Sequence, residues 1–342
     1  MNPHASVGRT ARHTSLSRRG MLAGLTAGSL SAALASAASR RRSDKARIAI
    51  TFDLEMSRMY PTRDVLEWDY QKGNLNEPTK DYSLQAARIA HELGAPIHFF
   101  CVGRVLEQAN IDWLQKIAAM GHPIGNHTYD HVNVWATEPE QTQFRFQRSP
   151  WLIHGRTARQ IIQENIRVTT LAMQQRAGIT AIGFRTPGGS SAALNGREDI
   201  QQLLLDEGFT WVSSGYPAHR SSLPGEEPSD EVFASIVEAQ RQAQPWVYPT
   251  GLIEIPMSPI SDVGAFRTSR WKLPHFLKAV RQCVAWAIRN HAVFDFLCHP
   301  SIMYVEDPQF ETVRLICELV RQAGDNAEIV GLQTIAAHVP TE

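Results

Sequence analysis

The chain has 342 residues, enough for one large domain or two modest ones, and its 43% hydrophobic content indicates a sizeable core. Basic and acidic residues each total 34, so the formal net charge is zero and no overall field attracts nucleic acid or an anionic membrane. The four cysteines show no C-x-x-C spacing, which argues against a zinc ribbon or a thioredoxin-like motif but leaves one or two unassigned disulfides open.

The N-terminal segment has the features of a targeting signal. Arg18 and Arg19 precede a weakly apolar stretch rich in Ala, Gly and Leu, which ends at an Ala-Ser-Ala sequence at 35–37. This pattern resembles a twin-arginine signal peptide, and the alternative is a basic tail with a chance arginine pair. We predict a signal at 1–37, a linker at 38–45 and one barrel domain at 46–342. The protein would then be exported to the periplasm or cell envelope, with no stable membrane anchor after cleavage.

From Lys45 onward, short apolar runs alternate with amphipathic segments, which indicates repeated βα units around a parallel sheet. The expected strands are Arg47–Phe52, Pro96–Val102, His122–Gly125, Ala181–Phe184, Thr210–Ser213, Leu252–Met257, Val293–Cys298 and Glu328–Val330. The expected helices are Tyr82–Leu93, Thr157–Ala177, Asp199–Glu207, Pro274–Arg289 and Gln309–Ala323, while Val132–Gly155 and Tyr216–Pro245 are expected to be loops. This order favours an α/β fold of the barrel type with parallel strands over a doubly wound open sheet.

Unusual polar residues follow the expected strands. Asp53 and Glu55 come after the first strand, His127 and His131 after the third, and Arg185 after the fourth. His299 follows the seventh strand. Because active sites of parallel barrels form at the C-terminal ends of the strands, we expect these side chains to converge there.

The histidines and one carboxylate form a candidate metal site. A single helical turn over His127–His131 would place both imidazoles on one face. Two imidazoles and a carboxylate leave coordination positions open, which suits catalytic zinc and also admits cobalt, nickel or iron. One of Asp53 and Glu55 would bind the metal and the other would accept a proton from the attacking water. Arg185 could orient that free carboxylate by a charge-assisted hydrogen bond, and His299 could protonate a departing amine.

Four segments, in order, resemble the motifs of the polysaccharide deacetylases of the NodB-homology type. They are Thr51-Phe52-Asp53, the pair His127-Thr128-x-x-His131, Arg185-Thr186-Pro187-Gly188-Gly189 and Leu297-Cys298-His299-Pro300. The first motif departs from the commonest form, which has adjacent aspartates, since here Leu54 separates Asp53 from Glu55. This spacing is closest to the peptidoglycan-deacetylase and allantoinase-like branch.

The resemblance implies an irregular (β/α)7 barrel that removes acetyl groups from N-acetylated amino sugars of an envelope or extracellular polysaccharide. It implies Asp53 as the general base, Arg185 as the residue that positions it and His299 as the general acid. The metal ligands would be Glu55, His127 and His131, with zinc as the first choice of ion. We also expect Pro187, Gly188 and Asp262 to contact the substrate, a carbohydrate polymer or oligosaccharide.

Other functions remain as alternatives. The chain could hydrolyse another small linear or cyclic amide, as allantoinase-like enzymes do, or it could be a barrel that has lost catalysis and only binds glycan. A zinc peptidase is excluded because Thr128, and not Glu, follows the first histidine of the pair. No G-x-S-x-G sequence supports serine hydrolase chemistry.

Overall fold

The computed structural model describes residues 45–66 and 68–341, so the predicted signal at 1–37 and most of the linker lie outside the described residues. The described strands form one nine-stranded sheet in the order β6-β7-β5-β4-β3-β2-β1-β8, with β9 paired to β1. The strands are β1 (Ala46–Leu54), β2 (Ile97–Cys101), β3 (Ile124–Asn126), β4 (Phe184–Ser190), β5 (Trp211–Gly215), β6 (Trp246–Val247), β7 (Ile253–Glu254), β8 (Val293–Cys298) and β9 (Ala327–Ile329).

The sheet is parallel apart from one edge. Every neighbouring pair from β7 to β8 along the sheet is parallel, and β6 alone runs antiparallel, beside β7. The chain after β7 approaches β8 through a backbone hydrogen bond of 2.7 Å from Ser258 N to Asp295 O. This contact brings the two ends of the curled sheet together. The prediction of an α/β fold of the (β/α)7 type is therefore confirmed.

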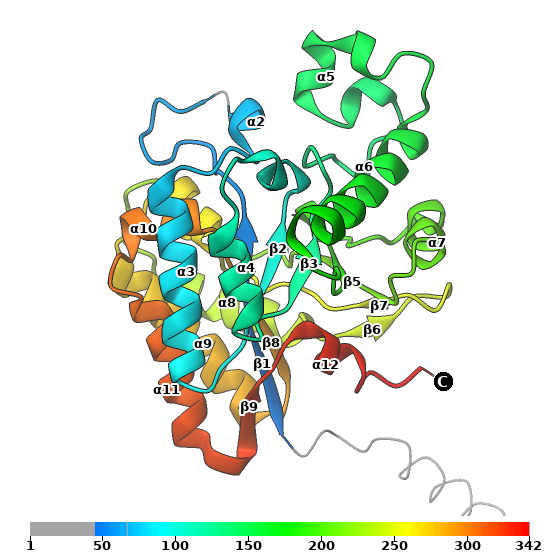
Figure 1. Ribbon diagram of the computed structural model, residues 1–342. Coiled ribbons are helices and arrows are strands. Elements are labelled where there is room, and N and C mark those ends of the chain that lie inside the picture. Colours follow the sequence, from blue (N-terminus) through cyan, green and yellow to red (C-terminus); the bar gives the residue numbers. More distant parts are fainter. Residues whose placement is uncertain (1–44, 67, 342) are drawn as a thin grey trace, which may run out of the picture. The chain divides into compact units, whose positions relative to one another are not determined.

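Helices cover the outside of the sheet (Figure 1). They are α2 (Trp68–Gln71), α3 (Glu77–Glu92), α4 (Asp112–Ala119), α5 (Phe144–Arg148), α6 (Ala158–Ala172), α7 (Glu198–Asp206), α8 (Asp230–Gln242), α9 (Leu273–Arg289), α10 (Pro300–Glu306), α11 (Glu311–Ala323) and α12 (Leu332–Ala336). Helix α9 packs between α8 and α11, and α3 packs against α4 and α10. None of the helices in the described ranges is long and apolar enough to cross a membrane.

Several expected elements differ from those observed, for local reasons. Helix α3 begins five residues before the expected Tyr82, because Asn76 caps it by accepting from Thr79 N and Pro78 fits its first turn. Strand β4 begins later than predicted, because Gly183 has a φ of +78° and interrupts the extended chain. A side chain at Gly183 would overlap the Trp211 ring, which explains why glycine is required there. Helix α8 lies inside Tyr216–Pro245, which we expected to be a loop.

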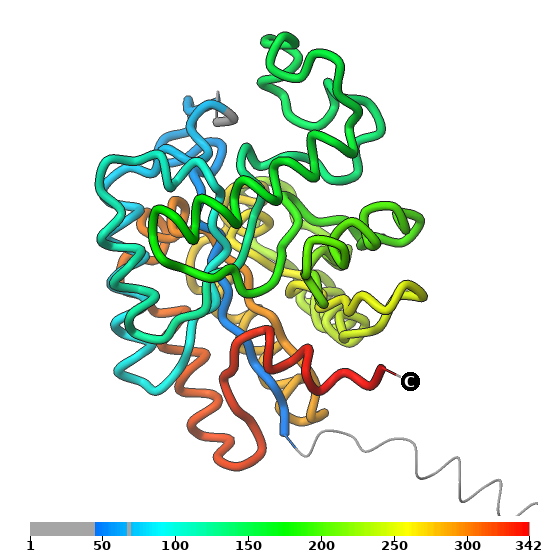
Figure 2. Tube along the Cα trace, turned by 45° about the vertical axis from the view of Figure 1, so that its right-hand side comes forward, coloured from blue at the N-terminus to red at the C-terminus, as the bar shows by residue number. Residues whose placement is uncertain are grey.

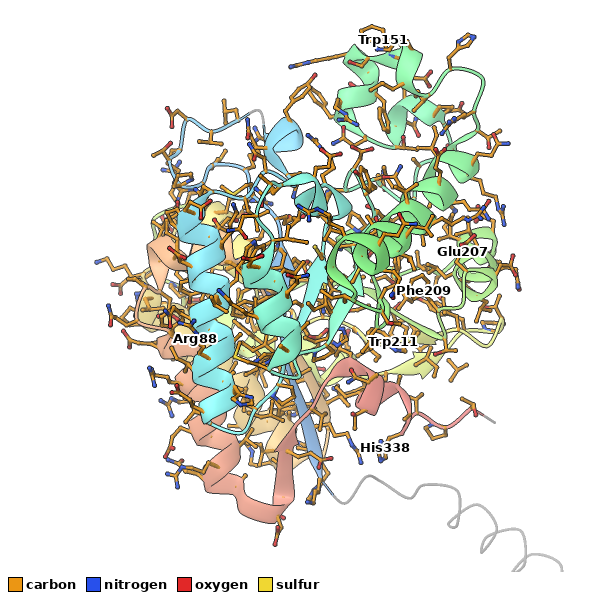
Figure 3. The ribbon with its side chains drawn as sticks, viewed as in Figure 1. Arg88, Trp151, Glu207, Phe209, Trp211 and His338 are labelled. Carbon is orange, nitrogen blue, oxygen red and sulfur yellow. The ribbon has the colours of Figure 1, made fainter. Side chains whose placement is uncertain are left out.

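The segment expected as a loop at Val132–Gly155 contains α5 and two short 3-10 turns. Figure 2 shows it extending beyond the end of α6, and Figure 3 places Trp151 at its outer tip. The Trp151 side chain is 71% exposed. All four cysteines are buried free thiols, so the disulfides left open by the sequence do not form.

Candidate active site

Strand β1 delivers two carboxylates to the centre of the protein. Its residues from Ile48 to Leu54 are all buried between β2 and β8, so the strand has little freedom to move. Asp53 is 4% exposed and Glu55, just beyond the strand end, is 3% exposed. Both side chains line one cavity of about 370 Å³, at the C-terminal ends of the strands. Buried carboxylates require partners of opposite charge, and these define the site.

His127 and His131 lie in a tight turn after β3 and not in the helical turn that we predicted. Thr128 and His131 both have positive φ values, +58° and +57°, which a helix excludes. The turn forms because Asn126 Oδ1 accepts from Thr128 N and Thr128 Oγ1 accepts from Val132 N. Hydrogen bonds to the side chains of Asn126 and Thr128 therefore replace the backbone hydrogen bonds that a helical turn would make here. The two imidazole rings nevertheless lie 5.0 Å apart, centre to centre.

Glu55, His127 and His131 offer ligand atoms that all lie within 4.8 Å of one another. Glu55 Oε2 lies 2.7 Å from His131 Nε2 and 3.5 Å from His127 Nε2. His127 Nδ1 donates to Arg185 O at 2.9 Å, since a carbonyl oxygen can only accept, so in the neutral ring Nε2 carries the lone pair. That buried Nε2 and the buried Glu55 Oε2 have no hydrogen-bond partner in the described structure. Lone pairs that face one another in this way fit a bound cation.

The charges of this group also fit a cation. Burial lowers the pKa of His131 to about 4, so the ring is neutral at neutral pH and able to coordinate. Burial alone would raise the pKa of Glu55, but His131, Lys72 and His127 together hold it well below its usual value. Glu55 is therefore ionised at neutral pH.

Lys72, which the sequence analysis missed, places a positively charged side chain beside Glu55. Its ammonium pairs with Glu55 Oε1, and both side chains are only 3% exposed. The pairing engages Oε1 and leaves Oε2 turned toward the histidines. Lys72 lies in a stretch without any motif, just before Gly73, and only the local fold brings it to the cavity.

Arg185 joins two carboxylates in the middle of the sheet. Its guanidinium is fully buried, and Nη1 lies 3.1 Å from Asp53 Oδ1 while Nη2 lies 2.6 Å from Asp295 Oδ2. Thr51 Oγ1 accepts from Nη1, Ser213 Oγ accepts from Nε, and the guanidinium lies over the Phe100 ring at 4.4 Å. Asp53 Oδ1 is thus fixed, and Oδ2 is directed toward the imidazoles of His127 at 3.7 Å and His299 at 3.9 Å.

His299 faces Asp53 and Glu55 from the end of β8, and Asp262 lies behind it. Asp262 Oδ1 lies 3.0 Å from His299 Nδ1, and Asp262 Oδ2 accepts from the His299 backbone N–H. Burial alone would lower the pKa of His299, but Asp262, Glu55 and Asp53 outweigh it and raise that pKa. Asp262 itself is fully buried. We expected it to contact the substrate, but its carboxylate is engaged with His299 instead.

The cavity lining includes only some of the residues expected to contact substrate. Gly188 lines it, whereas Pro187 is buried and does not contribute to it. Trp135, Trp151 and Trp246, whose rings could stack on sugar faces, do not line it either. The complete lining is Asp53, Glu55, Arg58, Lys72, His127, His131, Thr186, Gly188, Gly189, Tyr216, Met257, Ser261, Val263, Arg267, Leu297 and His299.

Replacing Lys72 by Met should destabilise the metal-free protein by about 2 kcal/mol, because Glu55 loses a buried charge-assisted partner. Removing this positive charge should also strengthen zinc binding, so added zinc should raise the melting temperature of the variant more than that of the wild type. Calorimetric melting with and without zinc measures both effects. Lys80→Met is the matched control, since the carboxylate partner of Lys80, Glu77, is exposed. Equal metal-free stability of Lys72→Met and wild type would contradict this role.

Comparisons with known proteins agree with this architecture. Residues 40–203 match the family described as polysaccharide deacetylase. A candidate polysaccharide deacetylase from Mycobacterium smegmatis superposes with a TM-score of 0.57 at 17% identity, over 88% of this chain and 92% of the other. The allantoinase PuuE gives a TM-score of 0.56 at 12% identity, with coverages of 87% and 91%.

A candidate polysaccharide deacetylase from Pseudomonas aeruginosa PAO1 gives a TM-score of 0.56 at 12% identity, over 85% of this chain and 90% of the other. At these identities the likenesses establish the shared fold. No curated protein sequence matches the chain. The family match of residues 40–203 spans Asp53, Glu55, the histidine pair and Arg185. The segment that carries these five residues therefore resembles the polysaccharide deacetylases, a family of hydrolases.

Proposed function

We propose that the protein is a metal-dependent deacetylase that hydrolyses the acetamido group of an N-acetylated amino sugar. The observation that carries this proposal is the cavity in which Glu55, His127 and His131 face one another beside a second carboxylate and a third imidazole. One carboxylate and two imidazoles with open positions suit zinc first, and cobalt, nickel or iron also fit such a ligand set. A bound divalent ion would supply a Lewis acid that polarises the acetyl carbonyl and acidifies water.

The side chains around this site have complementary tasks. Asp53 accepts the proton of the attacking water at Oδ2, because Arg185 holds its other oxygen. His299 donates a proton from Nε2 to the departing sugar nitrogen, because its Nδ1 is engaged with Asp262. Asp262 and Arg185 do not touch the substrate and act as positioning residues. The two proton-transfer groups lie 3.9 Å apart between His299 Nε2 and Asp53 Oδ2, at the ends of the neighbouring strands β8 and β1, and both line one cavity.

The proposed substrate is an envelope or extracellular glycan. The family match supports a carbohydrate, and the arginine pair near the N-terminus supports export to the periplasm by a twin-arginine signal. Secretion of a reporter fused to residues 1–45, and its loss in Arg18→Lys/Arg19→Lys, tests the export proposal. Retention of the wild-type fusion in the cytoplasm would argue against it.

Acetate release is the direct test of the activity. We expect the zinc-loaded protein to release acetate from N-acetylglucosamine oligomers, and His299→Gln to lose most of this rate. The fold likeness to an allantoinase makes ureide hydrolysis the second candidate function, so allantoin is assayed in parallel. Hydrolysis of allantoin without acetate release from any glycan would replace our proposal by that alternative. Binding of glycan without hydrolysis of either substrate would indicate a barrel that has lost catalysis and only binds glycan.

Replacing Asp262 by Asn should shift the alkaline limb of the pH profile of kcat/KM to lower pH. His299 must be protonated to act as an acid, and Asp262 is the largest influence that raises its pKa. Activity is therefore lost as pH rises through that pKa, and the loss should come earlier in the variant. The acid limb should stay in place. An unshifted alkaline limb in Asp262→Asn would remove His299 from the role of general acid.

A further inference from the structure

Three basic side chains, those of Arg58, Lys72 and Arg267, line the same cavity as the two carboxylates Asp53 and Glu55. Lys72 is paired with Glu55, and Arg185, behind the lining, is paired with Asp53. Arg58 and Arg267 have no carboxylate within ion-pairing distance among the described side chains. Among the charged side chains that line the cavity, three cations therefore face two carboxylates before any metal ion is added, and a neutral acetylated sugar has no charge to pair with Arg58 or Arg267.

Arg267 is the better positioned of the two arginines. It belongs to the π-helical turn Val263–Thr268, which directly follows Asp262. The guanidinium of Arg63 donates to the carbonyl oxygens of Phe266 and Arg267, and this fixes the backbone of the turn. This turn and the residue before it therefore serve two purposes. Asp262 lies behind His299, and Arg267 lies in the cavity wall.

The guanidinium of Arg267 has donors to spare. Its hydrogen bond in the described structure runs from Nη1 to Ser57 Oγ at 3.2 Å, which leaves the other donors of the planar group available. Burial lowers the pKa of Arg267, and the neighbouring Arg58 lowers it further, although Asp262 and Glu55 act in the opposite direction. A half-buried guanidinium near a second guanidinium is stabilised by an oxyanion, which both can bind.

We propose that Arg267, with Arg58 at the rim, forms an anion subsite, and that the substrate is an acetamido sugar carrying a carboxylate or a phosphate ester. This inference rests on the proposed deacetylase function, since it assigns the substrate class of that site. The subsite is on the wall formed by the turn after β7, next to Tyr216 and Val263, which also line the cavity. The anion would bind beside the group that is hydrolysed and would fix the sugar relative to Asp53 and His299.

Binding to the metal-free protein tests the subsite without relying on turnover. The probes are a neutral N-acetylglucosamine trimer, the trimer oxidised to the carboxylate at C6, and the trimer phosphorylated at C6. In calorimetric titrations with EDTA present, we expect at least one acidic trimer to bind about tenfold or more tightly than the neutral one, with the advantage decreasing as salt rises. The preferred acidic trimer identifies the anion as carboxylate or phosphate.

The preference should depend on Arg267. Arg267→Gln should bind all three trimers equally, Arg267→Lys should retain part of the preference, and the exposed control Arg321→Gln should behave as the wild type. If Arg267→Gln melts at a lower temperature, Arg58→Gln repeats the comparison. Equal affinity of the wild type for all three trimers would overturn the subsite, and so would a preference that survives in both Arg267→Gln and Arg58→Gln.

Acetate release separates this inference from the proposed function. If the zinc-loaded protein releases acetate from the neutral trimer as fast as from both acidic trimers, the deacetylase stands and the subsite fails. If the metal-free protein prefers an acidic trimer but the loaded protein deacetylates none of the three, the anion subsite stands and the proposed reaction fails.

Discussion

Asp53→Asn should lower kcat for acetate release by a factor of about 10² to 10⁴, the contribution expected of a positioned general base. The amide keeps the size of the carboxylate and can still accept from Arg185 through its oxygen. It cannot take a proton from water at neutral pH, so the chemical step is affected and the cavity is preserved. Initial rates of acetate release measure the effect.

Metal content separates this result from a damaged site. Asp53 is not among the three residues whose ligand atoms cluster, so Asp53→Asn should retain the same metal stoichiometry as the wild type. Asp81→Asn, on the exposed side of α3, serves as the control and should leave the rate unchanged. If Asp53→Asn kept most of the activity, another group would have to be the base. If it lost its metal, Asp53 would be a ligand.

Arg185→Met should destabilise the protein by about 3–5 kcal/mol, the usual cost of removing one partner from a buried ion pair. Both Asp53 and Asp295 would lose their guanidinium partner in the middle of the sheet. Burial raises the pKa of Asp295, and Arg185 is the largest influence that opposes it. The deficit should therefore shrink as pH falls and the Asp295 carboxyl group takes up a proton. Urea unfolding at several pH values measures it.

The matched control is Arg197→Met. Arg197 makes a bidentate ion pair with Asp199, whose side chain is 47% exposed, so its loss should cost less than about 1 kcal/mol. Similar losses of stability in the two variants would show that burial does not determine the strength of the Arg185 network. A deficit in Arg185→Met that grows toward acidic pH would contradict the electrostatic explanation.

The strands with strong apolar runs could be predicted, and those that depend on tertiary contacts could not. Val293–Cys298 was predicted with its observed bounds, because it is an apolar run interrupted only by Asp295 and contacts β1 along its length. The predicted bounds of strand β4 differ from the observed ones, since the start of the strand depends on the fit of Gly183 against Trp211. Helix α8 was missed because Tyr216–Pro245 is rich in polar and proline residues, although Val232, Phe233 and Ile236 do form its buried face.

Site residues that belong to a sequence motif could be found from the sequence, whereas site residues outside any motif could not. The motifs named Asp53, Glu55, His127, His131, Arg185 and His299, and the structure brings these six together. Asp295 was missed, although a single charge within an apolar strand is a signal that a buried partner is required. Lys72 and Arg267 offered no such signal. Their positions depend on how the loops fold over the cavity, which local sequence patterns do not determine.

The metal content of the purified protein tests the central claim most directly. Elemental analysis after dialysis against zinc, with His127→Ala and the buried but remote His122→Ala in parallel, should give one zinc per chain for the wild type and for His122→Ala. His127→Ala should retain little, because one of its three ligands is gone. Zinc retained equally by wild type and His127→Ala, or by neither, would contradict a metal site at Glu55, His127 and His131.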